Sequence, residues 1–234
     1  MEIRPLTLEQ RLAAVRALVF DFDGTLARLE IDFVLMRRRV LEVALCFGID
    51  ESQFQGRYLL ETMAAVRESL AAGDPAAAGR FETEALAVVE DLEMEAAARG
   101  GLFPSTRPAL RDLKESGYLL AVITRNFGRA VRTVFPDLPD FCSVFLPRET
   151  VPRVKPDPSH LLAALEALAV SSEQAIMVGD HPIDIETGRL AGTLTAGVAS
   201  GRMSPNELAA AGADLVFDHV GQLAGHLLRN HPDH

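Results

Sequence analysis

The chain has 234 residues, of which 48% are hydrophobic, and its 23 basic and 33 acidic side chains give a formal net charge of −10. This length fits one large domain or one domain with a smaller inserted module, and the apolar content argues against a disordered chain and a disulfide-framed miniprotein. An acidic chain without a long run of Lys and Arg lacks the concentrated positive charge that attracts nucleic acid or an anionic membrane. We therefore expect neither as a partner.

The first ten residues lack the basic and apolar segments of a secretory signal, and the longest apolar runs are far shorter than the ~20 residues that span a bilayer. These features predict a cytoplasmic protein. The two cysteines, Cys46 and Cys142, each stand among apolar neighbours. This context favours small buried side chains over a disulfide or a metal site.

The first predicted element is a strand over 17–20, which ends at the acidic turn that begins with Asp21. Residues 29–101 then show no convincing strand but three helical patterns, at 31–47, 53–72 and 75–99. An all-helical insertion directly after the first strand predicts a cap domain, 29–101, inserted into a core domain formed by 1–28 and 102–234. A cap at this point would cover the carboxyl end of the first strand.

The remaining elements alternate between strand and helix. Five further short apolar runs are typical of strands buried on both faces, at 119–123, 143–146, 175–178, 195–198 and 215–217. Helical patterns between them cover 105–116, with Ser105 as a candidate cap, 158–169, 184–191 and 203–211. This alternation predicts an α/β fold with a doubly wound, mostly parallel, Rossmann-like sheet. Ligands of such sheets bind beyond the carboxyl ends of the strands, where the strand order reverses.

Chemically active side chains gather at these strand ends: Asp21, Asp23, Thr124, Lys155, Asp180 and Asp184. Two acids two residues apart, such as Asp21 and Asp23, can divide between a nucleophile or metal ligand and a general acid or base. Four acids at one edge of a sheet would repel one another without a cation. The cluster, beside a lysine and a hydroxyl, predicts Mg²⁺ held by carboxylate oxygens and an anionic substrate.

The segments Asp21-Phe-Asp-Gly-Thr25, Thr124, Lys155 and Gly179-Asp180-His-Pro-Ile-Asp184 resemble, in this order, the four motifs of the haloacid dehalogenase-like hydrolase superfamily. The resemblance extends from about residue 17 to residue 201. The helical insertion is similar to the cap of the phosphoglycolate phosphatase and β-phosphoglucomutase branch. Asp23 favours phosphate esters as substrates, because dehalogenases of this fold displace a halide, which needs no protonation, and lack this second acid.

The resemblance implies a role for each matched residue. Asp21 would attack phosphorus to give an aspartyl-phosphate, and Asp23 would act first as general acid and then as general base. The substrate-binding set would comprise Gly24, Thr25, Thr124, Arg125, Asn126 and Lys155. The magnesium ligands would be the side chains of Asp21 and Asp180, the carbonyl of Asp23, and Asp184 either directly or through the metal's waters.

The predicted protein is a Mg²⁺-dependent phosphatase of a small phosphorylated metabolite, present as a monomer or a homodimer. One alternative is a phosphomutase of the β-phosphoglucomutase type, which returns the phosphoryl group to the sugar. Another is a noncatalytic phosphate-binding module that resembles a response-regulator receiver, which the long insertion fits poorly. His181 and the run Arg37-Arg38-Arg39 have no assigned role, and the cap carries no signature of a particular substrate.

Overall fold

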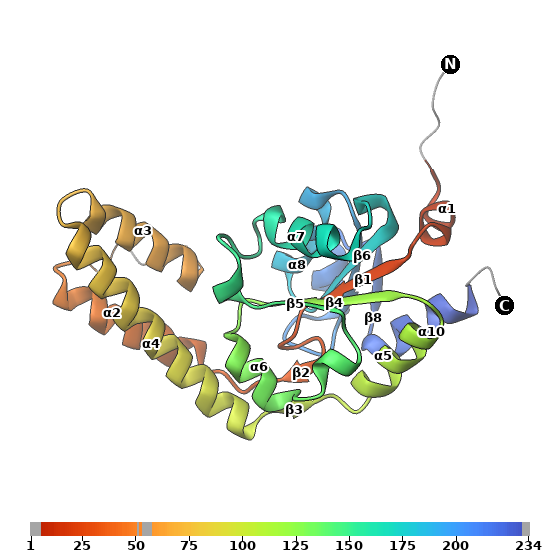
Figure 1. Cartoon of the computed structure of the whole chain (residues 1–234), viewed down its shortest axis with the longest axis horizontal. Helices are drawn as coiled ribbons and strands as arrows, with labels where there is room; N and C mark the ends of the chain where they lie inside the picture. The colour runs from red at the N-terminus through yellow and green to blue at the C-terminus, as the bar shows by residue number, and fades with distance from the viewer. Residues whose placement is uncertain (1–5, 51, 53–57, 231–234) are drawn as a thin grey trace, which may run out of the picture. The chain divides into compact units, whose positions relative to one another are not determined.

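The computed structural model describes residues 6–50, 52 and 58–230. Within them, the chain forms two compact units (Figure 1). The sheet unit consists of the chain up to Leu29 and from Gly100 onward, and the helical unit consists of Glu30–Arg99. In the part of the chain that the structure describes, no helix is both long enough and apolar enough to cross a membrane.

Six parallel strands form the sheet, in the order β5-β4-β1-β6-β7-β8. In chain order they are β1 (Ala17–Phe20), β4 (Leu119–Ile123), β5 (Val144–Leu146), β6 (Ala175–Gly179), β7 (Leu194–Val198) and β8 (Leu215–Phe217). At the centre, Phe20 of β1 pairs with Val122 of β4 and with Val178 of β6. The chain builds one half of the sheet as far as β5 and then crosses to β6, so the strand order reverses between β1 and β6. The predicted doubly wound sheet is confirmed.

Helices cover both faces of the sheet, which explains why its central strands are apolar along their whole length. On one face, α7 (Pro158–Leu168) packs through Leu161 and Leu165 against alternate residues of β1 and β4. Next to it, α8 (Pro182–Ala191) contacts β6 and β7. Figure 1 shows α5 (Thr106–Glu115) and α10 (Val220–Arg229) on the opposite side.

The sheet unit also contains several short elements. The sequence patterns did not predict α1 (Leu8–Ala13), α6 (Gly128–Val134), α10, or an antiparallel pair of two-residue strands, β2 (Ala27–Arg28) and β3 (Gly101–Leu102). The region predicted as a helix at 203–211 forms α9 (Pro205–Ala210). The described residues of this unit also form three single 3₁₀ turns, η2 (Leu138–Asp140), η3 (Arg148–Thr150) and η4 (Ser172–Gln174).

The start of α8 and the cap of α5 differ from expectation. The predicted start of α8 at Asp184 is wrong: the helix begins at Pro182, because His181 acts as its N-cap and Nδ1 accepts the Ile183 N–H at 3.2 Å. Ser105 does precede α5, but its side chain makes no capping hydrogen bond. A histidine cap gives a weaker sequence signal than the usual Ser, Thr, Asp or Asn.

The helical unit contains α2 (Phe33–Cys46), α3 (Leu59–Ala71) and α4 (Pro75–Arg99), and α4 contacts both of the other helices. Residues four apart on α2, namely Met36, Val40 and Ala44, are buried, as expected for one face of a helix. The predicted start of the second helix at residue 53 lies outside the described residues.

The expectation for the two cysteines is half right. Cys142 is buried, but Cys46 is exposed. The reason is helical geometry: Cys46 lies two residues after the buried Ala44 and therefore on another face of α2. Its thiol donates a hydrogen bond to the Glu42 carbonyl at 3.4 Å.

Candidate active site

A buried lysine lies between two carboxylates at the centre of the site. Lys155 Nζ is 2.6 Å from Asp21 Oδ1 and 2.6 Å from Asp184 Oδ1, and the lysine side chain is only 1% exposed. Asp21 follows β1 directly, and its N–H donates to the Val178 carbonyl of β6. Asp184 lies in the first turn of α8. A buried ammonium group needs partners of this kind, so the three side chains form one charged group.

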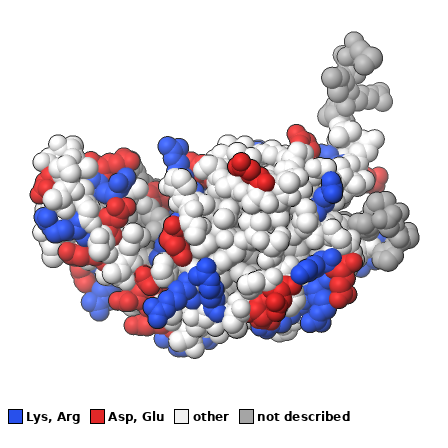
Figure 2. Space-filling view, in the orientation of Figure 1, with Lys and Arg blue, Asp and Glu red and all other residues white. Residues whose placement is uncertain are grey.

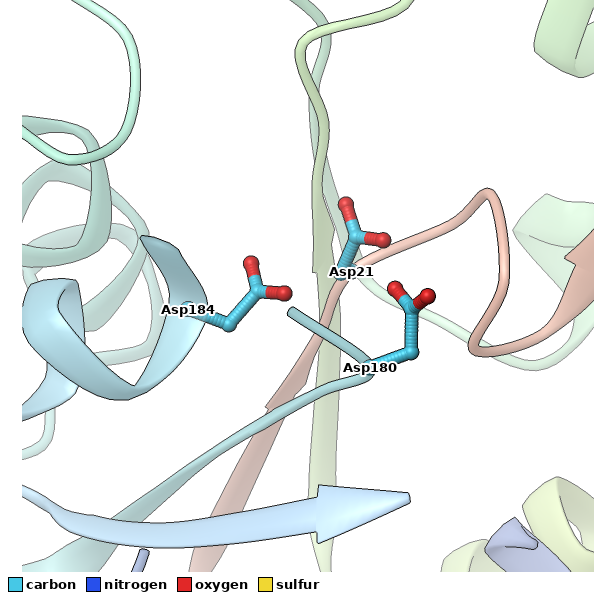
Figure 3. Close-up of side chains that lie close together, drawn as sticks. All are labelled: Asp21, Asp180 and Asp184. Atoms are coloured by element: carbon cyan, nitrogen blue, oxygen red, sulfur yellow. The ribbon is translucent and has the colours of Figure 1, made fainter. Parts of the chain in front are cut away.

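Asp180, the residue after β6, completes a cluster of three buried carboxylates. Oxygens of Asp21, Asp180 and Asp184 all lie within 4.8 Å of one another. Figure 3 shows the three side chains converging from the ends of β1 and β6 and from the start of α8. The cluster therefore lies where the strand order reverses, the usual ligand position in a doubly wound sheet.

Burial and mutual repulsion disfavour ionisation of Asp180 and Asp21. Burial first, and then the charges of Asp21 and Asp184, raise the pKa of Asp180 to about 8. Burial also raises the pKa of Asp21 to about 6, although Lys155 acts in the opposite direction. Burial acts against the charge of Lys155, but Asp184 and Asp21 outweigh it and raise the lysine's pKa. Three acids around one ammonium group leave an excess of negative charge that a cation would relieve.

The donor set fits a hard divalent cation. All three side chains offer carboxylate oxygens, and the group contains no thiolate or imidazole. Their close approach depends on Gly24, which has φ +89° and at which a Cβ would lie 2.2 Å from Asp180 Oδ2. Only glycine adopts this conformation readily and leaves room for the carboxylate.

Asp23 lies outside this group of three side chains. It is partly exposed, and its Oδ1 accepts the Leu29 N–H at 2.7 Å. Its charge contributes to the raised pKa of Asp180, so the two carboxylates influence each other. Thr25, by contrast, is fully buried, and its hydroxyl lacks a hydrogen-bond partner among the described residues.

The turn after β4 carries the other predicted residues. Thr124 Oγ1 donates to Asn126 Oδ1 at 2.9 Å and accepts the Asn126 N–H at 3.1 Å, and both residues are buried. The Arg125 guanidinium donates to the carbonyl of Lys155. Because β4 pairs with β1, this turn adjoins Asp21 at the carboxyl edge of the sheet.

A model of the haloacid dehalogenase-like hydrolase family matches residues 15–192. The chain belongs to this family. It is similar to the N-acetylmuramic acid 6-phosphate phosphatase of Pseudomonas putida, with 31% identity over 89% of this chain and 94% of that protein. A phosphoglycolate phosphatase of Cupriavidus necator is 30% identical over 88% of this chain and 90% of that protein.

The fold is similar to a solved haloacid dehalogenase-like hydrolase structure from Bacteroides fragilis, with a TM-score of 0.67 and 28% identity over 89% of this chain and 99% of that one. The family match and the relatives confirm the predicted superfamily and the predicted enzyme class, a phosphoric monoester hydrolase.

Two residues after β5 that sequence reasoning missed contact the turn after β4. Arg148 is buried, and its Nη1 donates to the Arg125 carbonyl at 3.1 Å. Both carboxylate oxygens of Glu149 accept the Gly128 N–H, at 3.0 and 3.2 Å, at the start of α6. These contacts hold both ends of the turn after β4. The signal that could have found them is their position, directly after a predicted strand.

A buried histidine holds the backbone of Lys155. His160 Nδ1 accepts the Lys155 N–H at 3.3 Å, and Nε2 lies 2.9 Å from the Leu146 carbonyl. Since Nδ1 is an acceptor, the ring proton must lie on Nε2 and be donated to Leu146. Burial lowers the pKa of His160 to about 4. The hydrolase therefore keeps this ring neutral at physiological pH.

Proposed function

We propose that this hydrolase is a Mg²⁺-dependent phosphatase that releases phosphate from a small phosphomonoester through an aspartyl-phosphate on Asp21. The observation that carries the proposal is the buried contact of Lys155 with Asp21 and Asp184, at 2.6 Å each. Phosphoryl transfer depends mainly on positioning and charge neutralisation. A carboxylate beside a fixed positive charge at the ligand-binding edge of the sheet supplies both.

The carboxylates of Asp21 and Asp180 and the carbonyl of Asp23 would hold the magnesium ion, with Asp184 as a further ligand or as a partner of its waters. The cluster of oxygens within 4.8 Å of one another and its excess negative charge support this set. When bound, the ion supplies neutralisation of the negative charge on the phosphoryl oxygens.

Asp21 would begin the reaction as the nucleophile. A carboxylate oxygen of Asp21 forms a bond to phosphorus while the bond from phosphorus to the ester oxygen breaks, and Asp23 donates its proton to the leaving oxygen. Asp23 then takes a proton from a water molecule that attacks the same phosphorus. Inorganic phosphate leaves, and the carboxylate of Asp21 is regenerated. The partial exposure of Asp23 supports this role, since both the alcohol and the water must reach it.

The phosphoryl oxygens would be bound by Lys155 and by the turn after β4. Thr124 and Asn126 hydrogen-bond to each other in this structure, so these bonds would rearrange when a phosphoryl group binds. The backbone amides near Arg125 would also donate to the phosphoryl oxygens. Gly24 and Thr25 stay in the predicted substrate-binding set. The burial of Thr25 favours a contact through its backbone over one through its hydroxyl.

We assign the role of a cap to the helical unit, as predicted for residues 29–101, with water exclusion and substrate selection as its tasks. The names of the two curated relatives suggest the substrates to test first, since N-acetylmuramic acid 6-phosphate and phosphoglycolate are both phosphate esters of carboxylic acids. We infer that a small phosphorylated carboxylic acid is the preferred class. The cytoplasmic location and the monomeric or homodimeric state stay predictions.

Phosphate release from a panel of esters, with Mg²⁺ or with EDTA, tests the proposal. The panel contains the two esters named above, glucose 6-phosphate and β-glucose 1-phosphate as esters without a carboxylate, and pyrophosphate. We expect Mg²⁺-dependent release that is fastest for the carboxylated esters. Asp21→Asn, which removes the nucleophile at nearly constant volume, should reduce release to background with an unchanged circular dichroism spectrum.

Two results would contradict the proposal. Release by Asp21→Asn above that of a mock preparation from cells without the protein would contradict the nucleophile, because contaminating phosphatase is the same in both preparations. Isomerised sugar phosphate formed without net phosphate release would favour the phosphomutase alternative.

A further inference from the structure

The loop after β7 reaches the acid cluster, although none of its residues belongs to the four motifs. The backbone N–H of Arg202 donates to Asp180 Oδ2 at 3.3 Å. Two residues earlier, Ser200 Oγ donates to the carbonyl of Gly24 at 2.8 Å. The loop, residues 199–204, thus holds both Asp180 and the turn after β1 that carries Asp21 and Asp23.

The carboxylate of Asp180 packs directly against the backbone of this loop. A Cβ at Gly201 would lie 1.8 Å from Asp180 Oδ2 and 2.5 Å from its Cγ, whereas real Cβ contacts are essentially never below 3.0 Å. The same oxygen would meet a Cβ at Gly24, on the turn after β1. Two backbone segments therefore confine Asp180, and any side chain at position 201 would displace either its carboxylate or the loop.

We propose that residues 200–202 of this loop fix the orientation in which Asp180 binds the cation, with Gly201 and Ser200 as positioning residues of the metal site. The inference rests on the proposed Mg²⁺ site and extends it to a segment outside the four motifs. Groups that orient a metal ligand affect metal affinity strongly, because a ligand held in place needs no rearrangement on binding.

The test measures binding of Mg²⁺ alone to the substrate-free protein, by calorimetry and by the rise in unfolding temperature with MgCl₂. Gly201→Ala should weaken Mg²⁺ binding about 10- to 100-fold. Ser200→Ala removes one hydrogen bond without a steric clash and should weaken binding about 5-fold.

The matched control is Gly197→Ala, on β7 just before the loop, where a Cβ would meet Leu208 at 2.9 Å and none of the acids. It should unfold at a lower temperature but bind Mg²⁺ as tightly as the wild type. Comparable weakening in this control would overturn the inference, because general destabilisation would then explain the loss.

Wild-type affinity in Gly201→Ala and Ser200→Ala would also overturn the inference. If Gly201→Ala does not fold, the comparison of Ser200→Ala with the wild type decides. A wild-type protein that binds no Mg²⁺ would overturn the proposed metal site and this inference with it. Failure of the proposed function is therefore distinguishable from failure of the loop's role alone.

Discussion

The two units use charged side chains in different ways. In the sheet unit, Lys155 is 1% exposed and lies 2.6 Å from each of two carboxylates. In the helical unit, Arg39 and Glu42 are 3.5 Å apart and roughly half exposed, as are Arg67 and Glu82 at 3.7 Å. Figure 2 shows acidic and basic side chains mixed over the visible face of this unit.

This difference separates charges that keep a surface hydrated from charges that carry chemistry. An exposed pair contributes little to stability, because water and salt screen it. A buried pair is costly to break, because the remaining partner stays in a medium of low polarity without compensation. In the sheet unit, such buried charges lie at the edge where a ligand would bind.

Removal of the buried lysine should give the largest effect. We expect Lys155→Met to lose all Mg²⁺-dependent turnover and about 3–5 kcal/mol of stability in EDTA at pH 7, since Asp21 and Asp184 lose their counterion. Urea unfolding and phosphate release measure the two losses. A variant of wild-type stability would show that the acids are not held together by this charge.

Asp23 tests whether a partly exposed carboxylate in the sheet unit also takes part in the chemistry. Asp23→Asn should slow turnover about 100- to 10,000-fold by removal of the acid and base, with little change in stability. Rapid-quench kinetics should show slower formation and slower hydrolysis of the phosphoenzyme. A change confined to Mg²⁺ affinity would instead make Asp23 a residue of the metal site alone.

The buried ring of His160 should make the stability of the sheet unit depend on pH. No histidine contributes in this way to the helical unit, since residues 30–99 contain none. The pKa of His160 is lowered from 6.5 to about 4, so the unfolded ring takes up a proton at a higher pH than the folded ring. The stabilising contribution is complete above pH 6.5 and disappears as the pH falls toward 4, a loss of about 3 kcal/mol.

Urea unfolding at pH 7, 5.5 and 4 should show this loss in the wild type on top of the titration of the carboxylates. His160→Gln, which retains a polar group but has no proton to gain, should lack this part of the slope. Parallel pH profiles for the two proteins would mean that the ring is protonated as easily when folded as when unfolded.

The smallest effect should come from the helical unit. Arg39→Met breaks the exposed pair with Glu42, and we expect a change in stability of at most about 0.5 kcal/mol, which 0.5 M NaCl should abolish. A loss above 1 kcal/mol would show that exposed charge in this unit also stabilises the fold.

The sequence predicted the sheet well, because strands covered on both faces must be continuously apolar and their turns carry the polar residues. The ends of β1 and β6 led to Asp21 and Asp180, and the starts of two predicted helices led to Lys155 and Asp184. The structure brings these four residues into one cluster. Here position along the chain translates into position in space, because parallel strands share one carboxyl edge.

Two kinds of feature were not predicted: those that depend on which face of a helix is buried, and those that depend on partners distant in the sequence. The exposure of Cys46 depends on which face of α2 is buried, and its apolar neighbours in sequence do not report it. Arg148 and Glu149 act on a turn more than twenty residues earlier, and apart from their position after a predicted strand no local pattern marks such a contact. The two-residue pair β2 and β3 is too short to have a periodicity.

The order of the strands has a consequence for biosynthesis. The first strand of the sheet to be made, β1, is also the central one, and it obtains its neighbours only when residues 119–123 and 175–179 have followed. Lys155 and Asp21, which meet in the site, are separated by 134 positions. Contacts so distant in sequence close slowly. On the ribosome, an apolar segment and the nucleophile beside it must therefore wait for most of the chain before the sheet can enclose them.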